Sequence, residues 1–272
     1  MKCIVCCIFC AFMVRLNKKK REGEPNVTNF RLTIEYDGRR YSGWQRQGNT
    51  DNTIQGKIEQ ILSRMTGHAV EINGAGRTDA GVHARAQVAN VKIRTDKTAQ
   101  EIQELLNHYL PQDIAVTACE QAPERFHARL NAKGKHYRYR LCDGGVPDVF
   151  ARNYVCAWEQ HLDVDAMQRA AAHLVGTHDF RAMSSVNKRF KKSTVRTITQ
   201  ITITRKPREI CFDVIGTGFL YNMVRILIGT LVEVGEGKRA PDSMPAILDS
   251  LDRQQAGVTM PPQGLTLETV LY

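Results

Sequence analysis

Isolated cysteines and the absence of a long hydrophobic run restrict what this chain can be. Four of its 8 cysteines lie within the first ten residues, and the others stand alone along the chain. Their spacing forms neither a metal-binding pattern with histidine nor the disulfide pattern of a secreted domain. The apolar run at residues 3–14 is too short to cross a bilayer. We therefore expect a reducing, cytoplasmic location, with no metal and no membrane.

The segment before residue 29 fits a secretory signal peptide poorly. Only Lys2 precedes the apolar run, and the basic stretch from Arg15 to Arg21 follows it where a signal peptide needs a small-residue cleavage site. A poor signal peptide, a tail that touches a membrane and sequence upstream of a start at Met13 all stay open. We favour the last, because nothing later in the chain requires this segment. Residues 1–28 are therefore interpreted as an extension that is disordered or a start-site artefact.

Length, composition and charge describe a basic globular protein. The chain has 272 residues, of which 42% are apolar and 24% charged, so it can bury one large core or two smaller ones. Its formal net charge is +10, and the 32 basic and 26 acidic residues outside residues 1–26 still leave +6. A positive body favours an anionic partner, of which nucleic acid is the commonest.

Hydrophobic periodicity predicts strands and helices in the first half of the chain. Apolar and polar residues alternate over residues 29–37, which is the period of a half-buried strand. Helical spacing follows the expected N-caps Asn52 and Thr98, and further strands are expected at residues 70–72, 87–93 and 113–118. Trp44 lies among arginines after the first strand, where it either stacks on unpaired nucleotides or anchors the core.

The second half of the chain partly repeats this order. Strands are expected at residues 133–141, 197–205 and 209–215, and helices at residues 164–174 and 219–234. We therefore predict an α+β fold with two similar halves, residues 29–130 and 131–272. Each half would be a largely antiparallel sheet with helices on one face, and the two would join side by side around a central cleft.

The stretch at residues 74–84 leaves almost no side-chain bulk around Arg77, Asp79 and His83. Glycine allows unusual backbone angles and lets another molecule approach closely, so we expect an exposed carboxylate held beside a cation. A glycine-rich turn with a surface ion pair is the alternative interpretation.

Arg225 lies within an apolar helix, where a charge is costly unless it is paired. A pair with Asp79 would join the two halves, keep the carboxylate ionised and orient it. An ionised aspartate in a cleft can be a metal ligand, a general base or a nucleophile, and the lack of a second ligand cluster argues against a metal. Tyr137 or Tyr139 would offer a planar substrate a stacking face. Alternatively, Arg225 reaches water at the rim.

Two basic loops favour a nucleic-acid partner. The first basic loop, residues 125–135, contains Arg129 and is nearly free of acid. The second basic loop contains Lys188, Arg189, Lys191 and Lys192, followed by Arg196. Each loop also contains a phenylalanine, which makes a groove for phosphates and bases more plausible. A charge run that is simply solvated remains the alternative.

Over about residues 29–272 the chain closely resembles the tRNA pseudouridine synthase A family. The most specific motif is Gly76-Arg-Thr-Asp-Ala-Gly-Val-His83. The other matching motifs are Tyr36-Asp-Gly, Gly43-Trp-Gln-Arg-Gln47, Phe126-His-Ala-Arg129, Lys135-His-Tyr-Arg-Tyr139, Gly176-Thr-His-Asp-Phe180, Gly218-Phe-Leu-Tyr-Asn-Met-Val-Arg225 with Gly229-Thr-Leu, and Pro261-Pro-Gln-Gly-Leu265. Their order and number leave little room for coincidence.

The resemblance implies an enzyme that converts uridine to pseudouridine at positions 38 to 40, in the anticodon arm of tRNA. It assigns the family's nucleophilic aspartate to Asp79, its substrate-stacking tyrosine to Tyr137 and its salt-bridging arginine to Arg225. It also implies a homodimer that takes one tRNA across both subunits, with no cofactor or metal. We expect Arg77, His83 and the two basic loops to contact the substrate.

Two other functions fit the sequence less well. A non-catalytic RNA-binding protein would not need Asp79, Tyr137 and Arg225 together. A hydrolase with a carboxylate nucleophile should have a second acid nearby and no need of basic loops.

Overall fold

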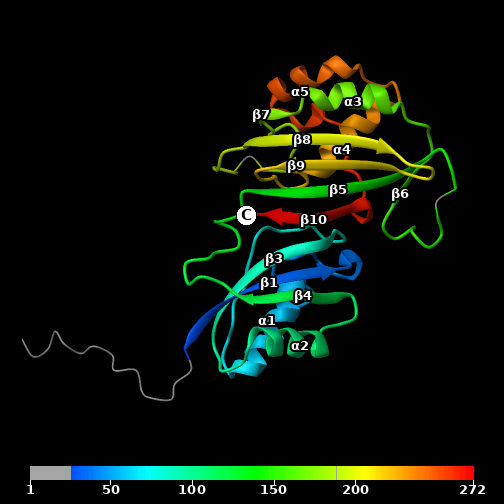
Figure 1. Ribbon diagram of the computed structural model, residues 1–272. Coiled ribbons are helices and arrows are strands. Elements are labelled where there is room, and N and C mark those ends of the chain that lie inside the picture. Colours follow the sequence, from blue (N-terminus) through cyan, green and yellow to red (C-terminus); the bar gives the residue numbers. More distant parts are fainter. Residues whose placement is uncertain (1–25, 147, 188) are drawn as a thin grey trace, which may run out of the picture.

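The computed structural model describes residues 26–146, 148–187 and 189–272. Its strands are β1 (Val27–Tyr36), β2 (Asn73–Gly74), β3 (His83–Arg94), β4 (Ile114–Gln121), β5 (Gly134–Asp143), β6 (Cys156–Trp158), β7 (Gly176–Asp179), β8 (Val195–Arg205), β9 (Ile210–Gly216) and β10 (Leu265–Leu271). They form one mixed, mostly antiparallel sheet in the order β4-β1-β3-β10-β5-β9-β8-β7, with β2 paired to β3 and β6 to β5 (Figure 1).

The helices gather at the two ends of this sheet. They are α1 (Ile54–Thr66), α2 (Ala99–Tyr109), α3 (Val164–Ala172), α4 (Met223–Gly235) and α5 (Met244–Ser250), with short 3-10 turns at Gly38–Arg40, Pro241–Ser243, Arg253–Gln255 and Pro262–Gly264. Helices α1 and α2 lie beside β1 and β4, whereas α3, α4 and α5 lie beside β7, β8 and β9 (Figure 1). None of the helices in the described ranges is long and apolar enough to span a membrane.

The alternation predicted for the first strand is confirmed. Phe30, Leu32, Ile34 and Tyr36 of β1 are all buried, while the residues between them are partly exposed. Because successive side chains on a strand point to opposite faces, one face of β1 packs against the core and the other is partly open. The strand begins at Val27, so residues 27 and 28 belong to the sheet and not to the predicted extension. Residues 1–25 of that extension lie outside the described residues.

Local capping interactions explain where the first two helices begin and end. The N-cap of α1 is Thr53, whose Oγ1 accepts from the Gly56 nitrogen at 3.2 Å, and not Asn52 as expected. The capping box predicted for α2 is confirmed, because Thr98 and Glu101 each bond to the other's backbone nitrogen. Gly67 closes α1 with a φ of 75°, in the left-handed region that glycine adopts without strain.

The strand β10 makes the sheet continuous, whereas we had expected two sheets. It pairs in parallel with β3, where Thr266 lies opposite His83, and antiparallel with β5, where Leu267 lies opposite Tyr137. Without β10 the facing edges of β3 and β5 would be left with unpaired backbone groups, which is unfavourable in a buried position. The α+β class and the mostly antiparallel pairing are confirmed, and the division into halves at residues 29–130 and 131–272 stays a prediction.

Candidate active site

The Asp79 loop (residues 75–82) connects β2 to β3, and its backbone packs directly against the backbone of the segment that follows β1. A Cβ atom on Gly38 would lie 1.9 Å from the Val82 oxygen, and one on Gly43 would lie 2.7 Å from the Thr78 oxygen. Only glycine permits so close an approach at either position. Gly43 also has a φ of 97°. The two glycines therefore fix the loop on both sides of Asp79.

Two aromatic side chains complete this seat. The backbone nitrogen of Trp44 donates to the backbone oxygen of Thr78 at 3.1 Å, and the Tyr36 hydroxyl lies 2.8 Å from Thr78 Oγ1. The indole of Trp44 is 1% exposed and packs where a Cβ atom on Gly74 would be. Of the two interpretations of Trp44, the structure therefore supports the core anchor and not the nucleotide-stacking surface.

The predicted pair between Asp79 and Arg225 is confirmed. Asp79 Oδ2 lies 3.7 Å from Arg225 Nη1, and the two side chains are 22% and 14% exposed. Arg225 Nε donates to the Met260 oxygen at 2.6 Å, and Nη1 donates to Asn222 Oδ1 at 2.9 Å. The guanidinium is therefore held in place from three sides and is not a rim side chain that reaches into water. The pair joins the Asp79 loop to α4.

Asn222 is a positioning residue that the sequence analysis missed. It lies just before α4 with a φ of 59°, a left-handed conformation that is uncommon outside glycine. Its side chain accepts from Arg225 and donates to Ser185 Oγ at 3.0 Å. Asn222 thus connects Arg225 to the segment that leads into the second basic loop. The signal in the sequence was an asparagine at a helix start, which suggests an N-cap, although its side chain makes no capping bond here.

The surroundings of Asp79 raise its pKa. Burial, which disfavours the charged form, is the main cause, and the nearby charge of Arg225 opposes it. We had expected the ion pair to favour ionisation outright, but at a separation of 3.7 Å it compensates only part of the cost of burial. A carboxylate that has lost part of its hydration is more basic and more nucleophilic than one in water.

Tyr137 lies beside this carboxylate. Its side chain on β5 is 7% exposed and meets the ring of Phe219 edge-on, with the ring centroids 5.2 Å apart. Burial raises the pKa of Tyr137, and the charge of Asp79 contributes to the rise, as expected for neighbours. The other candidate, Tyr139, is fully buried and donates to the Pro261 oxygen at 2.9 Å. The structure therefore brings Tyr137, and not Tyr139, into the site.

Arg77 is not the cation that accompanies Asp79. Its side chain is exposed, and its Nε donates to Gln45 Oε1 at 3.1 Å. The expected pairing within the loop is therefore wrong, because Asp79 turns inward to Arg225 while Arg77 points to solvent. This exposure leaves Arg77 accessible to a substrate.

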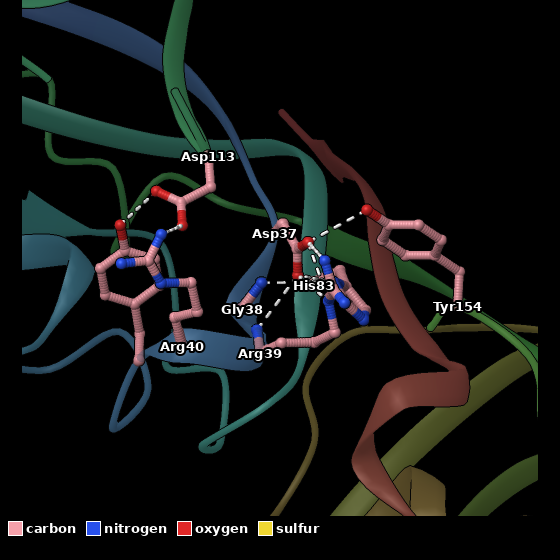
Figure 2. A network of polar contacts seen from close by, with 8 residues as sticks. Asp37, Gly38, Arg39, Arg40, His83, Asp113 and Tyr154 are labelled. Carbon is pink, nitrogen blue, oxygen red and sulfur yellow. Dashed lines mark hydrogen bonds and ion pairs between the residues drawn. The ribbon is translucent and has the colours of Figure 1, made fainter. Parts of the chain in front are cut away.

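A polar network around Asp37 encloses His83 (Figure 2). His83 Nδ1 lies 3.2 Å from both Asp37 Oδ1 and the Gly38 nitrogen. Arg39 and Tyr154 also donate to the Asp37 carboxylate. Burial raises the pKa of Asp37, but these hydrogen bonds outweigh it and lower the value to about 2. Because His83 is only 4% exposed, this geometry favours a structural part for it, and its contact with substrate stays a prediction.

The two basic loops expose cations and hold partly buried phenylalanines. Arg129, Arg189, Lys191 and Lys192 are exposed, while Lys188 lies outside the described residues. Phe126 and Phe190 both pack against the core. The loops therefore offer positive charge to a partner.

The central cleft expected around Asp79 stays a prediction. Two hollows on the described surface have volumes of about 300 Å³ and 700 Å³. The first lies between β5 and the turn that joins β8 to β9, and the second lies against α2. Neither is lined by Asp79, Tyr137 or Arg225. Within the described ranges, no group of three or more side chains of the types that hold metal ions comes together.

Comparison with known proteins identifies the enzyme class and then the family. A family model described as tRNA pseudouridine synthase matches residues 32–131 and 170–272. This match covers most of the chain and includes Asp79 and Arg225, although Tyr137 falls between its two ranges, so the protein is a pseudouridine synthase, an isomerase. The tRNA pseudouridine synthase A of Bacillus sp. (strain KSM-64) is 49% identical over 246 residues, which cover 90% of this chain and 100% of that protein.

Two further relatives agree with this assignment. The tRNA pseudouridine synthase A 2 of Bacillus anthracis and the tRNA pseudouridine synthase A of Acetivibrio thermocellus are each 44% identical over 246 residues, again 90% of this chain and 100% of the relative. The chain belongs to the tRNA pseudouridine synthase A family.

Proposed function

We propose that Asp79 is the nucleophile with which this enzyme converts uridine to pseudouridine at positions 38, 39 and 40 of the tRNA anticodon stem-loop. The observation that carries the proposal is the contact between Asp79 and Arg225 at 3.7 Å beside the ring of Tyr137. This arrangement combines a half-desolvated carboxylate, a fixed cation and an aromatic face for a planar base. The three tRNA positions are inferred from the family.

The chemistry needs no redox partner, because the reaction is an isomerisation. The bond from N1 of uracil to C1′ of ribose breaks, the base turns without leaving, and C5 bonds to C1′. The proton on C5 is lost, and N1 gains one. Asp79 attacks either the sugar or the base, or assists removal of the proton. Arg225 holds the carboxylate in position, and Tyr137 packs against the ring while it turns.

The target nucleotide has to leave the stem before Asp79 can reach it. Base flipping costs a few kcal/mol, which contacts between the phosphates and the basic loops can offset. The exposed side chains of Arg77, Arg129, Arg189, Lys191 and Lys192 suit this task. A homodimer that takes one tRNA across both subunits is part of the same proposal, because the family uses this arrangement.

The substitution Asp79→Asn tests the proposal most directly. It keeps the size of the side chain and removes its charge, so the fold and the tRNA affinity should largely survive. Turnover should vanish, because an amide neither adds to the substrate nor accepts its proton at neutral pH. The measurements are pseudouridine formation in unmodified tRNA and the dissociation constant of the same tRNA. Pseudouridine formation above a few per cent of the parent rate would show that another group is the nucleophile, and loss of tRNA binding would make Asp79 a structural residue.

A further inference from the structure

Three cations, Lys135, Arg129 and Arg196, gather beside the Asp79 loop, and Asp179 is a carboxylate near one of them, Arg196. Lys135 on β5 is half-buried, and no acidic group in the described part of the chain lies within ion-pair distance of it. Burial lowers the pKa of the Lys135 ammonium, and the charges of Arg129 and Arg196 lower it further. Arg196, at the start of β8, has its pKa lowered by burial as well, offset in part by Asp179. Clustered like charges that a counter-ion compensates only in part are the usual sign of a site for an anion.

The position of Lys135 relative to the catalytic residues is specific. Its side chain runs across Gly76, where a Cβ atom would lie 2.9 Å from Lys135 Cε and 3.5 Å from Nζ. The ammonium therefore lies against the Asp79 loop, three positions before the nucleophile. Lys135 also precedes Tyr137 by two residues on β5, so the two side chains project from the same face about 6.6 Å apart.

We propose that Lys135, with Arg129 and Arg196, binds a backbone phosphodiester of the RNA next to the nucleotide that packs on Tyr137. The inference rests on the proposed function and deepens it, because it names the part of the substrate that this side of the site holds. The bare backbone of Gly76 makes room for the Lys135 side chain, and a Cβ atom on Gly218 would lie 3.7 Å from Arg196 Cδ, so glycines border two of the three cations. A phosphodiester would neutralise the positive charge that Asp179 leaves uncompensated, and its attraction to the cations would offset part of their desolvation cost.

The melting temperature distinguishes a cation that binds RNA from a cation that stabilises the fold. A half-buried ammonium with no partner destabilises the free protein, so replacing it by an apolar side chain of similar length should not reduce stability. The substitution Lys135→Met should therefore leave the melting temperature unchanged or raise it, while it weakens RNA binding. A lysine with a purely structural role would give the opposite result.

The experiment measures the affinity of Lys135→Met for an unmodified tRNA across a series of salt concentrations. We expect the dissociation constant to rise roughly tenfold, equivalent to about 1.4 kcal/mol. The slope of log K against log salt should fall by about 0.7 to 0.9, the contribution of one phosphate contact. Lys92→Met, at an exposed lysine on β3, is the matched control and should change neither quantity. Inorganic phosphate should raise the melting temperature of the parent protein more than that of Lys135→Met.

Either of two results would overturn the site. One is a salt slope and an affinity equal to those of Lys92→Met, and the other is a phosphate response identical in Lys135→Met and the parent. Pseudouridine formation by the parent protein is scored separately. If the parent forms pseudouridine but Lys135→Met binds RNA normally, only this inference fails. If the parent forms none while Lys135→Met still loses one phosphate contact, the anion site stands and the proposed reaction fails.

Discussion

The ionisation of Asp79 is set by two opposing effects. Burial raises the pKa of the carboxyl, and the guanidinium of Arg225, held at 3.7 Å by Met260 and Asn222, lowers it. The group must be ionised to act as a nucleophile or a base, so activity should be lost as the pH falls through its pKa. The acid limb of the pH–rate profile therefore reports on the balance between burial and Arg225.

The substitution Arg225→Met should shift that limb to higher pH. Without the cation only the effect of burial remains, which raises the pKa of Asp79 further. Turnover at neutral pH should fall by at least about tenfold, because the carboxylate also loses its anchor. The measurement is kcat/KM for pseudouridine formation between about pH 4 and pH 8, since this ratio reports the free enzyme. Arg64→Met, an exposed arginine on α1, is the control. A limb that stays in place would mean that Arg225 does not govern the ionisation of Asp79.

At the scale of elements, the position of Asp79 depends on the segment that follows β1. This segment brings Gly38 and Gly43 against the backbone of the Asp79 loop and buries Trp44 beneath it. The loop has little side-chain bulk of its own to hold it in place. Backbone-to-backbone contact therefore does what side-chain packing does elsewhere in the fold.

The substitution Gly43→Ala tests this seat. The added Cβ atom would meet the Thr78 oxygen at 2.7 Å, and alanine is strained at a φ of 97°. The Asp79 loop would have to move, and a shift of about 1 Å can cost roughly 100-fold in rate. We expect kcat to fall within that range while tRNA affinity changes little. Gly48→Ala in the same segment meets no atom within 4 Å and should be neutral. Equal rates for the two variants would contradict the proposed seat.

The order of helices and strands was readable from periodicity wherever one face is buried. The alternation in β1 and the Thr98–Glu101 cap of α2 are local signals, and both were confirmed. The strand β10 and the helix α5 were not predicted, because nothing in their local sequence shows which partners they pack against. The prediction that Asp79 pairs with a cation of its own loop was also wrong. The path of the loop backbone decides whether Arg77 or Arg225 reaches Asp79, and sequence does not show this path.

At the scale of the whole molecule, β10 holds two groups of strands in one sheet. It lies between β3 and β5, and it places Leu267 opposite both Ala84 and Tyr137. The Asp79 loop enters β3, and Tyr137 belongs to β5, so β10 sets the distance across the site. Sequence analysis could pair Asp79 with Arg225 by charge, but it could not predict this strand order.

The substitution Leu267→Ala should weaken the sheet at its centre. Leu267 is completely buried, and removal of such a side chain costs about 2–5 kcal/mol of the free energy of unfolding. Activity should fall as well, because the spacing between the Asp79 loop and Tyr137 depends on this strand. Leu271→Ala, at the 42% exposed end of β10, should cost less than about 1 kcal/mol. Chemical denaturation of both variants gives the comparison, and equal losses would show that β10 is not central to stability.

The position of β10 also has a consequence for how the protein is made. The chain leaves the ribosome from its amino end, and β10 follows the other strands of the sheet in the sequence. Until it emerges, β3 and β5 expose unpaired edges of the kind that join to other chains. A nascent chain that stalls before residue 265 would therefore contain Asp79, Tyr137 and Arg225 and still present two unpaired strand edges. Such a truncated chain should therefore aggregate, and it should rarely persist as an inactive but folded protein.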